Sequence, residues 1–524
     1  MKKLTRIELL QQGQRLPDIR PLNGVPPEGY VKFSDDPELN HPFIQVIGQH
    51  VLDLGGFAKR CTDALPLASV GGGQLQTNPV LAALACRSLY KIPYPTPSLI
   101  RLHGRVLETL VLGYIDRNPL FDVEWNSVTH FLQANTVENI QKVVLAAPST
   151  NVPSIFVVGA SGMGKTFAME FILSLLPDVV KHVSFNGVAL NHVQVIHLYV
   201  QCPPTGTLKA LLFNILLALD FRLGTRFFHT WQSSIYSVDV LMVNVALILF
   251  NHGIGVLVLD ELQHLKARTN AEAEQSLNFF VSLMNFLKVP LVCVGTYAAM
   301  DVLTGTLRNG RRLGSNGSID FELYPKGSAV THSIEDYYLS HLPGLSKRPL
   351  TDEFRKSVRE IYQGLHFLLP NLVHRCTVET IYREKEFVSD EVLLHYRNVE
   401  LKPIKGALDA LRSNSPDRIQ LFDDLMSNDA IKALQDRQQR MGAESKRDSS
   451  DKQGATRPLT PGSGSGETVS EFPHHDISVE EIRHQCGLSK ALFGDGDVYP
   501  MLKSRKLLAT RLAYGELPPN LSSA

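Results

Sequence analysis

The segment Gly159-Ala-Ser-Gly-Met-Gly-Lys165-Thr166 constrains the fold of this 524-residue chain more than any other feature. It matches the pattern G-x-x-x-x-G-K-[ST], with the apolar run Ile155–Val158 before it and a helix expected from Thr166 through Leu176. Glycines let successive backbone N–H groups face phosphate oxygens, and the helix adds the positive end of its dipole. The sequence therefore predicts a phosphate-binding loop with cofactor contacts at Gly159, Ala160, Ser161, Gly162, Met163, Gly164, Lys165, Thr166 and Phe167.

A second motif completes the chemistry. Four apolar residues end in two carboxylates in Val256-Leu-Val-Leu-Asp260-Glu261. Asp260 and the Thr166 hydroxyl are expected to hold Mg²⁺, Lys165 to reach the terminal phosphates, and Glu261 to polarise the attacking water. An acidic strand end is a weak signal alone, but downstream of the phosphate-binding loop it predicts an ATPase that uses ATP and Mg²⁺.

The pattern between Asn151 and Lys326 alternates short apolar strands with longer helices, which predicts an α/β fold with a five-stranded parallel sheet and flanking helices. The helix expected before the fourth strand places apolar residues on one face, as core packing requires. The candidate strands are Ser154–Val158, Gln194–Val200, Gly255–Leu259, Leu291–Val294 and Ile319–Leu323, and that apolar face comprises Leu277, Phe280, Val281, Met284 and Leu287.

Turn-rich and polar stretches divide the chain further. We expect an N-terminal partner-binding extension at 1–148, the ATPase core at 149–326, a helical lid at 327–428, a flexible linker at 429–475 and a C-terminal tail at 476–524. The tail has a capping box at Ser478 and a basic, apolar end, so it either docks on a partner or folds back on its own body.

Composition excludes some classes of protein. Lys plus Arg equals Asp plus Glu, at 52 each, so DNA binding would need a local basic surface. No uncharged apolar run reaches the length of a membrane span, about 18 residues. The six cysteines form no CxxC pair, and hence no zinc site or disulfide framework is indicated. The cytoplasm is the expected location.

Two further positions admit two interpretations each. Thr296, just after the fourth strand, can sense the γ-phosphate or cap the next helix. Leu307-Arg-Asn-Gly-Arg-Arg312 can supply an arginine to a neighbouring protomer's nucleotide, or form a solvated basic loop.

The sequence resembles the TnsC family, AAA+ regulators of Tns-type DNA transposition, and the related TniB-like proteins. The resemblance covers residues 90 to 425. It is carried by the stretch from Leu257 through Gln263-His264 to Gly295-Thr296, by Leu307–Arg312, by Leu401–Ile419 and by Gly113–Pro119.

This resemblance implies a bacterial, nucleoid-associated ATPase that oligomerises as a ring or filament on double-stranded DNA and links a target selector to transposase subunits. It implies arginine fingers at Arg311 and Arg312, with Arg308 behind them, and it places Arg117 and Asn118 near the nucleotide base. It also implies DNA contacts by Lys209, Arg222 and Arg226, which otherwise read as ordinary helix surface, and transposase docking by the tail. Tyr362–Pro370 departs from AAA+ proteins that carry a sensor arginine there. The alternatives are a helicase loader or initiator and a STAND-like signalling NTPase.

Overall fold

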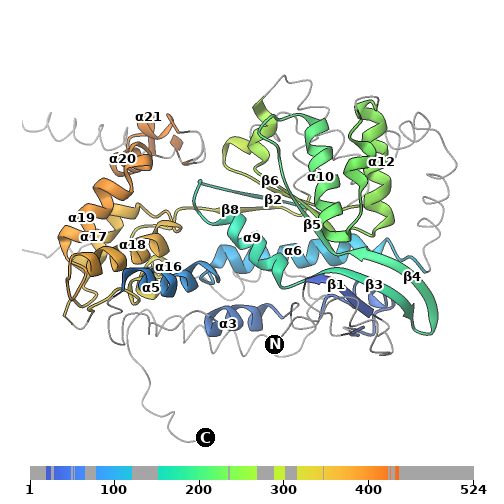
Figure 1. Cartoon of the computed structure of the whole chain (residues 1–524), viewed down its shortest axis with the longest axis horizontal. Coiled ribbons are helices and arrows are strands. Elements are labelled where there is room, and N and C mark those ends of the chain that lie inside the picture. Colours follow the sequence, from blue (N-terminus) through green and yellow to red (C-terminus); the bar gives the residue numbers. More distant parts are fainter. Residues whose placement is uncertain are drawn as a thin grey trace, which may run out of the picture. The chain divides into compact units, whose positions relative to one another are not determined.

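The computed structural model describes residues 19–24, 29–32, 34–48, 51, 53–64, 78–120, 152–233, 236–267, 288–300, 315–345, 347–422 and a few positions from 425 to 435 (Figure 1). The expected helix with Leu277 and Leu287 lies outside the described residues, as do most of the predicted linker and all of the tail. The chain divides into two compact units, residues 1–402 and 403–524. The smaller unit contains α20 (Lys405–Ser413) and α21 (Pro416–Ile419).

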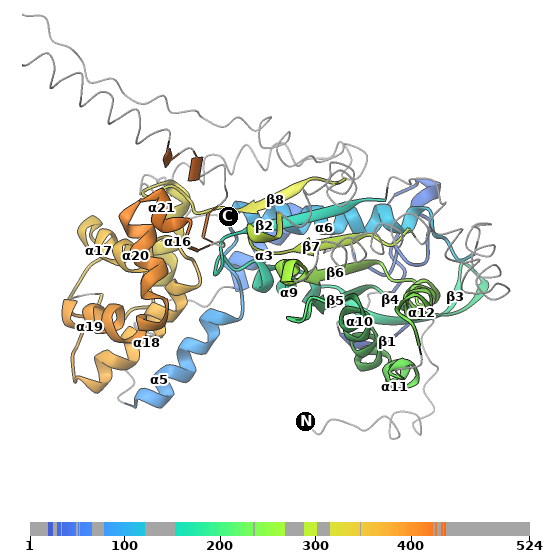
Figure 2. The same cartoon turned by 90° about the horizontal axis from the view of Figure 1, so that it is seen from above.

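A five-stranded sheet forms the centre of the larger unit. Its strands are all parallel and lie in the order β5–β6–β7–β2–β8, which Figure 2 shows from above. Every residue of β2, β6 and β7 is buried, as expected for strands covered on both faces. The predicted five-stranded parallel sheet is therefore confirmed. The strands are β5 (His197–Gln201), β6 (Val256–Asp260), β7 (Leu291–Val294), β2 (Ser154–Gly159) and β8 (Ser318–Phe321).

Helices from distant parts of the sequence cover this sheet. The long helix α6 (Pro97–Ile115) packs along β8, β2 and β6 and contacts α9 (Lys165–Ser174), the helix after the phosphate-binding loop. At the edge strand β5, α10 (Leu208–Leu223) packs beside α12 (Val238–Asn251), with the short α11 (Phe227–Trp231) next to it (Figure 2). Since α6 belongs to the predicted N-terminal extension, that segment supplies part of the core. None of the described helices has both the length and the apolar character of a membrane span.

A second sheet has three antiparallel strands in the order β1–β3–β4, with β1 at Ile19–Gly24, β3 at Pro177–Phe185 and β4 at Val188–Val195. Asn186 and Gly187 connect β3 to β4, and both have positive φ, 49° and 81°. This is the backbone that a two-residue hairpin of type I′ requires.

The prediction of one strand over Gln194–Val200 is wrong, because the chain changes sheets within it. β4 ends at Val195, β5 begins at His197, and only Ile196 lies between them. The Ile196 N–H donates to the Asp178 carbonyl of β3 at 3.0 Å, and its own carbonyl accepts from the Val256 N–H of β6 at 3.2 Å. The backbone of one fully buried residue thus bonds to both sheets.

The lid consists of helices, as predicted. Ser328, Thr351 and Ser389 each cap a helix by accepting a bond from the third helical N–H. A further helix from the N-terminal segment, α5 (Pro79–Cys86), packs against α18, while α3 (Leu54–Ala64) packs against α6. The lid helices are α16 (Ala329–Leu339), α17 (Asp352–Tyr362), α18 (Leu368–Tyr382) and α19 (Asp390–His395), which a π-helical turn, Tyr396–Glu400, follows.

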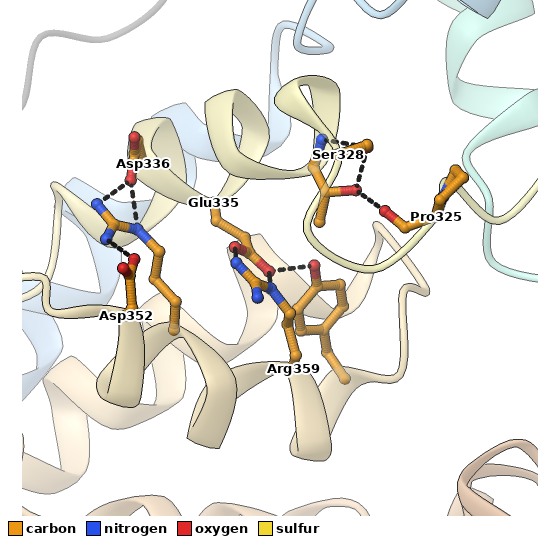
Figure 3. A network of polar contacts seen from close by, with 9 residues as sticks. Pro325, Ser328, Glu335, Asp336, Asp352 and Arg359 are labelled. Carbon is orange, nitrogen blue, oxygen red and sulfur yellow. Dashed lines mark hydrogen bonds and ion pairs between the residues drawn. The ribbon is translucent and has the colours of Figure 1, made fainter. Parts of the chain in front are cut away.

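A buried ion pair joins α16 to α17 (Figure 3). Glu335 is fully buried, and Arg359 Nε and Nη2 donate to its two carboxylate oxygens at 2.6 and 2.7 Å. The Tyr362 hydroxyl adds a third bond at 2.8 Å. This hydrogen bonding to Glu335 raises the pKa of Arg359. Arg355 pairs with Asp336 and Asp352 on the same helices, but its partners are half-exposed and exposed.

We expect Arg359→Met to lower the free energy of unfolding by about 3–5 kcal/mol, because it leaves the Glu335 carboxylate buried without a charge partner. The matched control is Arg355→Met, for which we expect a loss of about 0–1 kcal/mol, since its partners stay hydrated. Urea unfolding followed by circular dichroism measures both. Equal losses in the two variants would show that the buried pair is not the stronger link between α16 and α17.

Candidate nucleotide-binding site

The phosphate-binding loop connects the carboxyl end of β2 to the start of α9. Gly162 and Gly164 have φ values of 79° and 83°, which lets the loop curve before the helix begins at Lys165. Lys165 is 8% exposed, and its Nζ donates to the carbonyls of Gly159 and Ala160, each at 2.8 Å. The ammonium therefore lies inside the curve of the loop, next to the N–H groups of the first turn of α9.

The two predicted metal-binding residues meet at this edge of the sheet. The Thr166 hydroxyl donates to Asp260 Oδ2 at 2.7 Å, and Asp260 is 2% exposed at the end of β6. A hydroxyl and one carboxylate suit Mg²⁺, which takes its remaining ligands from phosphates and water. Among the described residues no group of three His, Cys, Asp or Glu could hold a metal alone. This donor set therefore fits Mg²⁺ bound together with a nucleotide.

Tyr199, which sequence reasoning missed, is a further partner of Asp260. Its hydroxyl, on the neighbouring strand β5, donates to the same Oδ2 atom that Thr166 contacts. Burial, the hydrogen bond to Asp260 and the charge of that carboxylate raise the pKa of Tyr199. The phenol is therefore a neutral donor, which holds Asp260 in place from the side opposite the loop.

Glu261 and Thr296 lie at the ends of adjacent strands. Glu261 follows β6 with φ at 57°, and its N–H donates to Asp260 Oδ1 at 2.7 Å. Thr296 follows β7 and is 8% exposed. Its hydroxyl is buried and has no hydrogen-bond partner among the described residues, so no helix cap by this side chain is present there.

On the other side of β2, an acidic residue of β8 lies near the loop. Tyr297 donates to Asp320 Oδ1 at 2.7 Å. Burial raises the pKa of Asp320, and the positive charge of Lys165 opposes that shift. Neither residue has a local sequence signal, because an acidic position within an apolar strand and a tyrosine after another strand meet only in the folded sheet.

The lid contacts the loop through Phe367, which precedes α18. The Phe367 N–H donates to the Gly162 carbonyl at 3.2 Å. The ring fills the space beside Gly162, where an added Cβ would lie 2.3 Å from a ring carbon. The segment in which many AAA+ proteins carry a sensor arginine thus presents an aromatic ring to the loop.

The structure does not bring Arg117 or Asn118 to this loop. Arg117 is 2% exposed, and it donates to the carbonyls of Gly113 at 2.6 Å and Ile254 at 2.8 Å. Ile254 precedes β6, so Arg117 lies at the amino ends of the strands, about 20 Å of strand away from Asp260. Burial lowers the pKa of Arg117 to about 10. Asn118 bonds the Leu120 N–H in a local turn, and both residues stand outside the nucleotide site.

The three expected DNA contacts do not form one patch. Lys209 lies at the start of α10 over the ring of Phe213, 5.8 Å from its centroid. Arg222 lies about 20 Å further along the helix and pairs with Asp178 of β3. Arg226 is exposed where α11 begins. Arg308, Arg311 and Arg312 lie outside the described residues.

Residues 123–315 match the model of the bacterial TniB protein family. The predicted resemblance is confirmed. The matched part of this TniB-like chain includes the phosphate-binding loop, Asp260, Glu261 and Thr296. A search of curated proteins finds no match.

Solved structures show only distant similarity to the TniB-like chain. A Walker-type ATPase of Pyrococcus abyssi is 14% identical with a TM-score of 0.32, covering 58% of this chain and 88% of its own. The RuvB Holliday junction branch migration motor of Thermotoga maritima is 13% identical with a TM-score of 0.27, and the match covers 50% of this chain and 68% of the RuvB chain. A katanin structure is 12% identical with a TM-score of 0.24, and the match covers 61% of this chain and 92% of the katanin chain. The fold therefore rests on the strand order described above.

The contact between Phe367 and Gly162 predicts a difference between two glycines. Gly162→Ala should destabilise the chain by about 2–4 kcal/mol, because its Cβ meets both an unfavourable φ and the Phe367 ring. Gly164→Ala is the matched control, since a Cβ there meets nothing within 4 Å and only φ opposes it. We expect a loss of about 1–2 kcal/mol for this control.

Adding Phe367→Ala to each variant separates the steric effect from the backbone effect. The second substitution should be strongly non-additive with Gly162→Ala and additive with Gly164→Ala. Urea unfolding of the two glycine variants, of Phe367→Ala alone and of the two double variants measures this. Additivity in both pairs would contradict the described contact.

Proposed function

We propose that this TniB-like chain hydrolyses ATP with Mg²⁺ and uses the ATP-bound and ADP-bound states as a switch. The observation that supports it most is the 2.7 Å contact between Thr166 and Asp260. This contact brings the phosphate-binding loop of β2 and the acidic end of β6 to one place. Lys165 lies beside them, where an ammonium can meet phosphate oxygens.

Each residue of the site would have a separate role in ATP binding or hydrolysis. The loop N–H groups and Lys165 would bind the phosphates, and Thr166 with Asp260 would hold Mg²⁺, which neutralises phosphate charge when bound. Glu261 would orient the water that attacks the γ-phosphate and accept its proton. Thr296 offers a buried hydroxyl without a protein partner among the described residues, which can donate to a γ-phosphate oxygen or to that water.

The ATPase would act in DNA transposition. The family match supports a role in which the chain oligomerises on double-stranded target DNA and links a target selector to transposase subunits. Because the chain has no net charge, DNA binding would depend on local cations such as Lys209 and exposed Arg226. Arg222 is engaged with Asp178 and is a weaker candidate. The N-terminal segment and the C-terminal tail would bind the protein partners.

Two substitutions separate nucleotide binding from hydrolysis. Lys165→Ala should weaken ATP binding by about 100-fold or more, since the phosphates lose their cationic partner. Glu261→Gln should leave ATP affinity nearly unchanged and lower kcat by about 10²- to 10⁴-fold, since an amide cannot accept the proton. Fluorescent-nucleotide titration and phosphate release measure the two effects, with Lys181→Ala and Glu353→Gln as exposed controls of matched chemistry.

Undiminished turnover in purified Glu261→Gln protein would remove Glu261 from the mechanism. Electron microscopy with ATP and duplex DNA tests the assembly. We expect ATP-dependent oligomers that persist in Glu261→Gln and fail to form in Lys165→Ala. Assembly that is indifferent to DNA would favour a signalling NTPase over a transposition regulator.

The arginine pair at 311 and 312 is proposed to act across a protomer interface. Replacing both by Ala should leave ATP binding by the monomer intact and lower turnover by about 10³-fold, as the loss of an arginine finger does. Mixing this protein with Lys165→Ala should restore part of the activity, because each supplies what the other lacks. No recovery in a mixture that demonstrably co-assembles would argue for a solvated loop without a role in the neighbouring site.

A further inference from the structure

Gln263 connects two residues that the proposed function assigns to hydrolysis. It belongs to the short 3-10 helix Leu262–Ala267 directly after β6. Its Nε2 donates to the Glu261 carboxylate, and its Oε1 accepts from the Thr296 backbone N–H at 3.2 Å. One amide side chain thus joins the end of β6 to the end of β7.

The chemistry of the two partners determines the orientation of this amide. A carboxylate accepts hydrogen bonds and a backbone N–H donates one. If the amide were rotated by 180°, its oxygen would face the Glu261 carboxylate and its NH₂ would face the Thr296 N–H. Both contacts would then be repulsive, so only the observed orientation satisfies both neighbours.

The surroundings leave Gln263 little freedom. A Cβ on Gly295 would lie 3.1 Å from Gln263 Oε1 and 2.6 Å from the Ala299 Cβ, so the amide occupies space that only glycine provides. Leu262 and Leu265, on either side, are each 1% exposed. His264 Nδ1 lies 3.1 Å from the Cys202 carbonyl, just after β5. The turn that carries Gln263 is therefore attached to the strands on both sides of β6.

Glu261 needs such a partner more than most carboxylates do. Its backbone has φ at 57°, in the left-handed region, and a glutamate side chain has three rotatable bonds. A general base must lie within hydrogen-bond reach of the proton that it accepts, so a freely rotating carboxylate is a poor one. The Gln263 amide leaves one carboxylate oxygen for water and fixes the direction of the group.

We propose that Gln263 is a positioning residue for ATP hydrolysis, which holds the Glu261 carboxylate and ties it to Thr296. It touches neither the nucleotide nor the attacking water and acts through these two residues. A shift of Thr296 on γ-phosphate binding would reach Glu261 through this amide. The inference rests on the proposed ATPase function and adds a residue that links phosphate recognition to the base.

Two nearly isosteric substitutions test it. Gln263→Met removes both hydrogen bonds at similar volume. Gln263→Glu keeps an acceptor for the Thr296 N–H but places a second carboxylate against Glu261. Each should lower kcat for ATP hydrolysis by about 10- to 100-fold, with KM and the affinity for a fluorescent ATP analogue changed by less than about twofold. Gln232→Met, at an exposed glutamine after α11, is the matched control and should retain wild-type turnover.

A double-mutant comparison identifies the path of the effect. If Gln263 acts through Glu261, then Gln263→Met should cause almost no further loss of kcat in the Glu261→Gln background. Equal fold-losses in both backgrounds would overturn the proposal, as would wild-type kcat in Gln263→Met and Gln263→Glu proteins that bind nucleotide. If Gln263→Met fails to bind nucleotide, Gln263→Glu decides by the same criteria. A wild-type protein without ATPase activity would overturn the proposed function, and this inference with it.

Discussion

The hydrogen bond between Thr166 and Asp260 depends on the arrangement of the whole sheet. Its residues follow β2 and end β6, two strands that are not neighbours, because β7 lies between them. They meet only because all three strands are parallel and end at the same edge. The burial of every residue in these strands keeps that edge in register. The proposed nucleotide site thus depends on the apolar packing of side chains in the interior of the sheet.

The local sequence pattern is sufficient to predict a strand where a single segment contains the whole signal for it. β2, β6 and β7 were predicted because a short apolar run next to a glycine-rich or acidic segment has few alternatives. The hairpin from β3 to β4 was missed, although Asn186-Gly187 is a typical type I′ turn sequence. The run Gln194–Val200 has the pattern of one strand, because apolar residues lie on both sides of the change of sheet at Ile196. That change depends on the Asp178 and Val256 backbones, which no local pattern contains.

The functional site divides in the same way. The loop, Asp260 and Glu261 belong to contiguous motifs and could be found. Tyr199, Asp320 and Phe367 contact partners far away in sequence, and Gln263 joins neighbouring Glu261 to distant Thr296, so their roles become apparent only in the fold. Arg117 shows that a resemblance can also mislead. It lies in the segment Gly113–Pro119, which resembles the TnsC family, and this resemblance implies a nucleotide contact. In the structure, Arg117 instead donates hydrogen bonds to two backbone carbonyls in the interior.

The junction at Ile196 limits how the two sheets can move. A single residue offers two soft backbone dihedrals, and here hydrogen bonds on its N–H and carbonyl hold both. The hairpin is therefore joined to β5 by one hydrogen-bonded residue and not by a loop. A molecule that binds the exposed end of β4 and moves this strand would therefore also move β5, because no loop lies between them. Since β5 carries the tyrosine that contacts Asp260, a displacement of the hairpin would be passed on to the carboxylate that is proposed to hold Mg²⁺.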